Sequence, residues 1–284
     1  MKNFISRYKV LLFLVIALLS SWSIWIPMAL GRLGIIEFNV PIIIGQSIGG
    51  IAPLIVLILL DKISKGGYGI KQIFDSIRIK GKNIIWLIPA ALILPLTTIS
   101  GSLLNYWVIN EGELRILAIT PLNTLGFWLI AIIPLTFFAG LLSSPILEEP
   151  CWRGFALGHL QNKFGKHIGS LILGSFWWLW HQPINIANGL EVNLYSYLIM
   201  LSHSFLFDSI YNLSSKNLLS AMFAHSSAII TYTYIYQSQN IYVVLIFLIA
   251  IIVLRTFEWK RNELNLEIVS IRDEISFQPH KKRK

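Results

Sequence analysis

Apolar runs of spanning length recur along this chain and constrain its fold more than any other feature. A helix needs about 20 mostly apolar residues to cross the hydrocarbon core of a bilayer. Five runs of this kind lie at 10–30, 40–60, 84–104, 125–147 and 240–256. Shorter or more polar runs lie at 168–182, 195–211 and 217–236. These runs predict an all-α polytopic membrane protein with about eight transmembrane helices and a site inside the helix bundle.

Composition agrees with this assignment. Hydrophobic residues are 55% of the chain and charged residues are 13%, about half the usual share in soluble proteins. The net charge of +9 would also suit a nucleic-acid-binding protein. The Lys and Arg residues, however, lie in short loops and in the tail, so topology explains them better. We therefore expect the lipid bilayer as a partner and no nucleic acid.

The distribution of positive charge predicts the orientation. With eight spans and a cytoplasmic N-terminus, all but two of the 23 Lys and Arg residues fall on the cytoplasmic side, and the exceptions are Arg32 and Arg115. The first run continues beyond the length of a signal peptide, so we interpret it as an uncleaved span. We expect a multi-pass protein of the cell membrane with both termini in the cytoplasm. A helical domain would occupy 1–258, and a basic cytoplasmic tail would occupy 259–284.

Two adjacent carboxylates and an arginine follow the run at 125–147, in the sequence Leu-Glu-Glu-Pro-Cys-Trp-Arg-Gly. A charged side chain at membrane depth is costly and usually marks function. Glu149 and Arg153 are four residues apart, so they share a helix face and can pair. Glu148 would then be free for another role, near the cytoplasmic face.

Two histidines, His181 and His225, end later apolar runs, and we expect the helices to bring them to the two glutamates. A glutamate can serve as a general base when burial or a like-charged neighbour favours its protonated form. The histidines could orient a water, polarise a carbonyl or bind a metal. One glutamate and two histidines also form the ligand set of several catalytic zinc sites, and Glu148, His181 and His225 would supply these residue types. The sequence is compatible with a divalent metal such as zinc, or with none.

In their order and spacing, these residues resemble the motifs of the CPBP family (CAAX protease and bacteriocin-processing, or Abi) of intramembrane proteases. Residues 148–153 match the family's Glu-Glu-x-x-x-Arg motif. Residues 177–181 look like its Phe-x-x-x-His motif, with Trp for Phe as a mild change. Residues 205–225 are similar to the region leading to its last histidine. The resemblance covers about 125–236, the expected family core.

The resemblance implies a CAAX-type intramembrane endopeptidase, either a glutamate protease or a metalloprotease. Its substrates would be membrane-associated peptides or protein C-termini, cut by water that a glutamate activates, without an acyl-enzyme. Glu148 would be the base, Glu149 and Arg153 would support it, and His181 and His225 would lie in the site. The family also includes proteins involved in bacteriocin immunity.

One position departs from the family's pattern. The family often has Asn or Asp four residues after the last histidine, thought to help hold the oxyanion, and this chain has Ile229. One alternative is therefore a catalytically impaired immunity or scaffold protein of the same fold. Another is a proton-coupled transporter, although the sequence shows no inverted repeat.

The remaining polar and small residues have structural interpretations. We expect His203 and Asp208 to form helix–helix hydrogen bonds, and Cys151 to be inert packing rather than a nucleophile. Gly45 and Gly49 form a small-xxx-small pair that predicts close approach of helices.

Overall fold

The chain is helical wherever regular structure is described. The computed structural model describes residues 2–79, 81–109, 116, 128–235 and 239–276, and within these ranges no β-sheet is present. The start of the predicted run at 125–147, Arg115 and the basic run Lys281–Lys284 lie outside the described residues. The all-α prediction is therefore confirmed.

Among the described residues, seven long helices form the bundle. They are α1 (Lys2–Arg32), α2 (Ile42–Ile63), α4 (Leu87–Ile109), α9 (Lys166–Ala187), α10 (Leu194–Leu213), α11 (Leu218–Tyr234) and α12 (Ile241–Ser276). Shorter elements connect them: α3 (Ile70–Asp75), η1 (Gly81–Trp86), α6 (Leu129–Leu141), α7 (Ser144–Glu149), η3 (Pro150–Leu157) and α8 (Gly158–Phe164).

Five helical stretches in the described part of the chain are long and apolar enough to cross a membrane. They are Tyr8–Arg32, Ile42–Ile63, Asn83–Ile109, Ala131–Phe164 and Ile241–Arg261. The more polar runs predicted from sequence form α9, α10 and α11. The chain is thus a polytopic helical membrane protein, and the number of eight spans stays a prediction.

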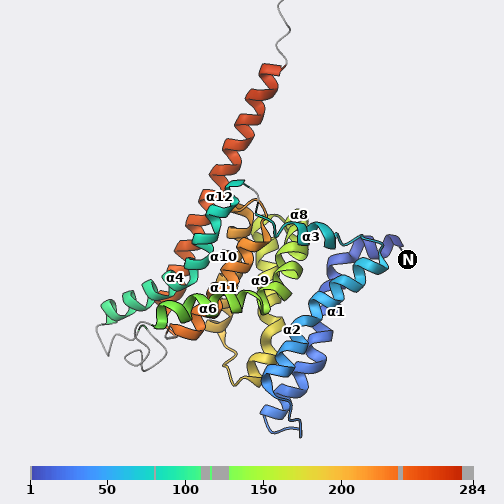
Figure 1. Cartoon of the computed structure of the whole chain (residues 1–284), viewed down its shortest axis with the longest axis vertical. Coiled ribbons are helices and arrows are strands. Elements are labelled where there is room, and N and C mark those ends of the chain that lie inside the picture. The colour runs from blue at the N-terminus through green and yellow to red at the C-terminus, as the bar shows by residue number, and fades with distance from the viewer. Residues whose placement is uncertain (1, 80, 110–115, 117–127, 236–238, 277–284) are drawn as a thin grey trace, which may run out of the picture.

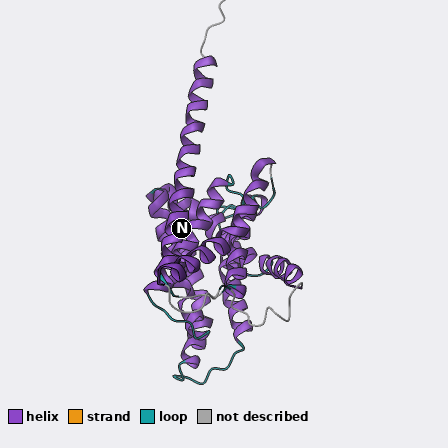
Figure 2. Cartoon of the chain, turned by 90° about the vertical axis from the view of Figure 1, so that its left-hand side faces the viewer, coloured by secondary structure: helices purple, strands orange, loops and turns teal. Residues whose placement is uncertain are grey.

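The bundle has two flanks and a centre. Figure 1 shows α1 and α2 packed together on one flank and α4 with α12 on the other, while α9, α10 and α11 lie between them. The end of α12 continues as a lone helix beyond the body (Figures 1 and 2). Because α12 runs unbroken through residue 258, the predicted division into a helical domain and a tail falls inside a helix. That division stays a prediction.

Small residues allow α1 and α2 to pack closely, as predicted. The Ser21 hydroxyl donates to the carbonyl of Gly49 at 2.7 Å, and the Trp25 indole donates to the carbonyl of Gly45 at 2.9 Å. A Cβ atom on Gly49 would overlap the indole of Trp25, so any larger residue here would force a shift. Trp25 is thereby fixed between the two helices.

The helix that leads to the two glutamates is interrupted just before them. α6 ends at Leu141, a turn follows, and α7 begins at Ser144 with Pro145 in its first turn. Proline is well accommodated at this position because its missing N–H would have no helical partner there. The break lets α7 enter the bundle in a new direction and carries Glu148 and Glu149 inside.

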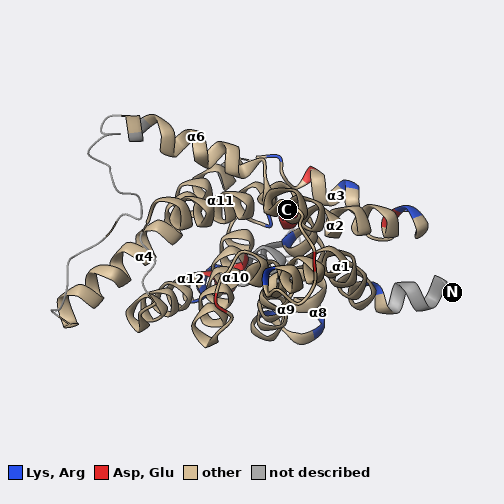
Figure 3. Ribbon diagram, turned by 90° about the horizontal axis from the view of Figure 1, so that it is seen from below, with Lys and Arg blue, Asp and Glu red and all other residues tan. Residues whose placement is uncertain are grey.

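Charged residues are mostly absent from the bundle, and the ribbon in Figure 3 is accordingly almost all uncharged. The buried exceptions among the described residues are Asp61, Glu148, Glu149, Arg153, Asp208, Arg255 and Glu258. Because a buried ion is costly unless it is paired, each of these residues is expected to have a polar partner inside the bundle.

Candidate active site

The two glutamates lie where an α-helix changes into a π-helix. Glu148 and Glu149 end α7, and residues 150–157 form η3, which is a π-helix. Pro150 has no N–H to give to an α-helical hydrogen bond, which favours a local change in helix geometry. Single π-turns occur frequently at functional sites. Arg153 lies within this turn, close to both carboxylates in sequence.

Glu148 is held by two tryptophans. Its side chain is almost completely buried, and its Oε2 accepts hydrogen bonds from Trp177 Nε1 at 3.0 Å and Trp152 Nε1 at 3.3 Å. No described residue donates to Oε1. One carboxylate oxygen is therefore fixed, and the other is left for a ligand.

Glu149 belongs to a buried ion network with Arg153. The predicted pair is present, with Arg153 Nη1 3.1 Å from Glu149 Oε1 and both side chains fully buried. Arg153 Nε lies 3.1 Å from Asp208 Oδ1 of α10, and Nη2 donates to the Ser204 hydroxyl at 2.9 Å. Two carboxylates and a hydroxyl thus accept hydrogen bonds from the guanidinium of Arg153, which is fully buried. Pairing of this kind makes a buried charge tolerable, although Glu149 Oε2 and Asp208 Oδ2 have no hydrogen-bond partner among the described residues.

His225 approaches Glu149 and not Glu148. Its Nδ1 lies 2.8 Å from Glu149 Oε1, and its ring stacks on Phe207 with the ring centroids 5.5 Å apart. The histidine thus joins α11 to the ion network of Glu149 and Arg153.

His181 is oriented by the backbone of its own helix. Its Nδ1 lies 2.8 Å from the carbonyl oxygen of Trp177, and the ring packs edge-on against Trp177 and Trp180. A carbonyl oxygen can only accept, so Nδ1 carries the hydrogen and Nε2 keeps its lone pair. Nε2 is therefore the ring nitrogen available to a ligand.

A cavity of about 500 Å³ lies between α1, α2, α7 and α9, and both Glu148 and His181 line it. Its apolar walls are Trp25, Ile42, Ile43, Leu147, Trp180 and Ile184. Its polar lining comes from Gln46, Ser47, Ser143 and Ser144. Glu149, Arg153 and His225 are not part of its lining, so the predicted residues form two layers.

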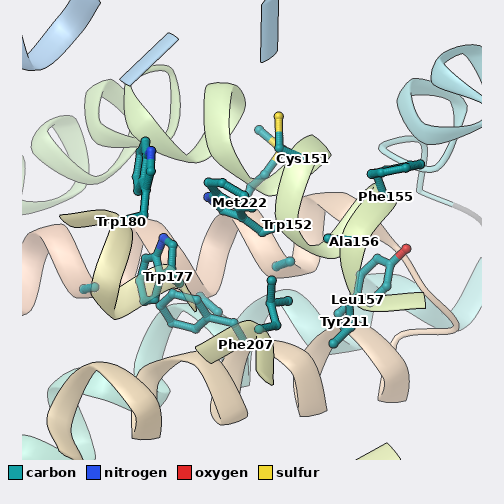
Figure 4. Packing of buried hydrophobic residues seen from close by; sticks show 14 of the residues in the cluster. Cys151, Trp152, Phe155, Ala156, Leu157, Trp177, Trp180, Phe207, Tyr211 and Met222 are labelled. Carbon is teal, nitrogen blue, oxygen red and sulfur yellow. The ribbon is translucent and has the colours of Figure 1, made fainter. Parts of the chain in front are cut away.

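Aromatic rings separate the two layers. Figure 4 shows Trp177 beside Phe207, with Trp152 and Trp180 on the other side of Trp177. The guanidinium carbon of Arg153 lies 5.2 Å from the ring centroid of Trp177 and 5.0 Å from that of Phe207. Trp177 thus contacts the residues of both layers.

The candidate metal ligands do not converge on one point. Within the described ranges, no three His, Cys, Asp or Glu side chains are grouped so that they could hold a metal ion. Among the candidate ligands, His225 uses Nδ1 on Glu149, while Glu148 and His181 line the cavity. The arrangement does not fit the three-ligand zinc site that the sequence allowed.

Several contributors to the site were not assigned to it from sequence. Asp208 does link two helices, as expected, but its partner is the arginine of the motif. Ser204 and Asp208 are four residues apart on α10, and this polar pair in an apolar run was the available signal. The role of the Trp152 and Trp177 indoles as donors had no such signal, because tryptophan is common in membrane helices.

Ile229 lies against another helix. A Cβ atom on Gly140 of α6 would be 3.2 Å from Ile229 Cδ1 and 3.4 Å from its Cγ2. Its side chain therefore packs on α6, and it does not line the cavity.

The part of the chain that holds the site is similar in sequence to known proteins. Residues 128–247 match the family described as type II CAAX prenyl endopeptidase Rce1-like. CAAX prenyl protease 2 of Methanococcus maripaludis is 37% identical over 67 residues, which is 24% of this chain. The chain thus matches only 22% of the length of that relative. The family match contains every site residue named from the motifs, from Glu148 to His225.

Proposed function

We propose, from the match of residues 128–247, that this chain belongs to the CPBP family of CAAX-type proteases and is an intramembrane endopeptidase. Its base would be Glu148, and its substrates would be membrane-associated peptides or protein C-termini.

The observation that carries this proposal is the setting of Glu148. Its Oε2 is fixed by two indole N–H groups, and the residue lines a cavity shared with His181. A general base must lie within hydrogen-bond reach of the proton it removes and be held in one orientation. The fixed carboxylate meets both requirements toward a water bound in the cavity.

The reaction follows from these groups. Oε1 of Glu148 takes a proton from water while the water oxygen attacks the scissile carbonyl carbon. The carbon–nitrogen bond of the resulting tetrahedral species then breaks, and the proton on Glu148 passes to the leaving amine. His181 Nε2 orients the water or receives a proton in this sequence. The products are a carboxylate and an amine, and no acyl-enzyme forms.

The buried layer would support the base without touching the substrate. Ion pairs and hydrogen bonds among Glu149, Arg153, Asp208 and His225 join α7, η3, α10 and α11. Rigid support of this kind keeps catalytic groups within the narrow range of productive geometry.

The cavity favours a largely apolar peptide segment. Most of its walls are aliphatic or aromatic, while Gln46, Ser47, Ser143 and Ser144 offer hydrogen bonds to a peptide backbone. A cavity of this kind suits a substrate that reaches the site from the bilayer. The relative's name refers to prenylated proteins, and for this chain we propose the wider class of membrane-associated peptides and C-termini.

The proposal includes a location. The distribution of Lys and Arg supports a multi-pass protein of the cell membrane with both termini in the cytoplasm. Glu148 would then act near the cytoplasmic side of the bilayer.

The test compares wild type with Glu148→Gln and His225→Ala on quenched peptides reconstituted with the enzyme in lipid nanodiscs. Wild type should cut the peptides. Glu148→Gln should lower the rate by at least about 1000-fold, because glutamine cannot take a proton from the attacking water. Circular dichroism and gel filtration must show both variants folded. A parallel arm with a chelator should leave the rate unchanged.

Loss of activity with the chelator, restored by added zinc, would contradict the metal-free form of the proposal. An inert wild type whose effect in cells survives Glu148→Gln would instead favour the immunity or scaffold alternative, which Ile229 motivates.

A further inference from the structure

We propose that Trp177 is a positioning residue whose indole N–H fixes the carboxylate of Glu148 for base catalysis. The inference rests on the proposed role of Glu148 and adds a residue that the motif comparison treated as a mild substitution.

The geometry of the contact is specific. Trp177 Nε1 of α9 donates to Glu148 Oε2 at 3.0 Å, and Trp152 Nε1 of η3 donates to the same oxygen at 3.3 Å. The carboxylate is thus held by donors from two different helical elements. Hydrogen bonds to an ionised group are about twice as strong as those between neutral groups. Such hydrogen bonds are stronger still in a buried site of low dielectric constant.

The indole of Trp177 is itself immobilised. Its ring packs edge-on against His181 at 5.1 Å and against His225 at 5.7 Å between centroids, and Phe207 lies at 5.9 Å. The guanidinium of Arg153 lies over its face. With the side chain almost completely buried, the N–H cannot turn away from Glu148 without displacing both layers of the site.

The presence of tryptophan at position 177, where the family motif has phenylalanine, matters because of its indole N–H. Phenylalanine, which the family motif has at this position, would fill most of the same space but has no hydrogen to donate. Tryptophan therefore changes how Glu148 is held. Other indoles on α9 do not do this, because Trp178 donates to Ser196 and Trp180 Nε1 has no partner in the described part of the chain.

The first experiment compares Trp177→Phe with Trp178→Phe in the peptide assay. Trp177→Phe keeps an aromatic ring and removes the N–H, so kcat should fall about tenfold while KM changes by less than about twofold. Trp178→Phe also removes an indole N–H from α9 but lies away from Glu148, so both constants should stay at the wild-type values. Equal kcat values for the two variants would overturn the inference.

A second variant separates the hydrogen bond from packing. Incorporation of the tryptophan isostere with sulfur in place of the N–H preserves the ring size at position 177. It should reproduce the loss of kcat, whereas full activity would show that Trp177 acts only by filling space.

A spectroscopic measurement is independent of activity. In ¹⁵N-labelled protein, the indole signal missing from Trp177→Phe identifies Trp177, and this signal should move in Glu148→Gln while that of Trp178 does not. A Trp177 signal unaffected by Glu148→Gln would overturn the inference. If the signal moves but wild type cuts no peptide, the contact is upheld and the proposed function fails.

Discussion

Arg153 and Asp208 are 55 residues apart in sequence, yet Nε and Oδ1 meet at 3.1 Å with both side chains fully buried. Burying both charges is tolerable because they pair with each other, and Arg153 has Glu149 as a second carboxylate partner. The pair therefore ties the π-helix η3 to α10. Since Arg153 also pairs with Glu149, which contacts His225, one ion network joins four elements around the site: α7, η3, α10 and α11.

Asp208→Asn should destabilise the fold more than any neighbouring polar substitution. Breaking a buried ion pair costs about 3–5 kcal/mol, so the apparent Tm in detergent should fall well below that of wild type. Ser209→Ala is the matched control, because Ser209 is equally buried but carries no charge, and its hydroxyl donates to the carbonyl of Phe205. If both variants melt at the same temperature, the pair does not stabilise the fold as described.

Gly49→Ala should disrupt the packing of α1 on α2. The new Cβ would overlap Trp25, which lines the cavity, and overpacking of this kind costs about 1–3 kcal/mol. Gly50→Ala is the control for stability, because a Cβ on Gly50 meets nothing within 4 Å. Thermal unfolding of the two variants should therefore give a lower Tm only for Gly49→Ala. A Tm unchanged by Gly49→Ala would show that the two helices can separate at little cost.

Cys151→Ala should keep the proposed peptidase activity. The thiol is fully buried and its Sγ lies 3.5 Å from the carbonyl oxygen of Leu147, so it serves packing. Initial rates should stay within about twofold of wild type, and a maleimide should label the thiol only after unfolding. Loss of activity in a folded Cys151→Ala protein would point to a thiol nucleophile.

Ile229→Asn should lower stability without raising the rate. The side chain packs on Gly140 of α6, so the substitution places an amide against an apolar helix surface at a cost of about 1–3 kcal/mol. Ile229→Val, which keeps the apolar contact, is the control. A kcat increase of about tenfold in Ile229→Asn would mean that the isoleucine impairs catalysis in wild type.

Much of the architecture was predictable because it depends on local patterns. Apolar runs of spanning length fixed the all-helical membrane class. The four-residue spacing of Glu149 and Arg153 predicted a pair that the structure contains. The glycines of α2 likewise predicted a close helix contact, which Trp25 and Ser21 make.

The division of the site into two layers was not predictable, because it depends on how distant helices pack. Nothing in the sequence around His225 distinguishes a contact with Glu149 from one with Glu148. Asp208 could be expected to find a partner, but its partner depends on the position of α10 beside η3. The hydrogen bond from Trp177 depends on the same packing, since an indole serves equally well as apolar filling.

The π-helix at 150–157 has a consequence for how this chain can vary in length. Deleting Pro150 or Cys151 would bring Trp152 and Arg153 one position nearer to the glutamates in sequence, and each residue of an α-helix turns the chain by about 100°. Arg153 would then point away from Asp208, and Trp152 would leave Glu148, although every motif residue was still present in the sequence. The spacing between the glutamates and α8 is therefore as restricted as the residues themselves, and insertions or deletions belong in the loops instead.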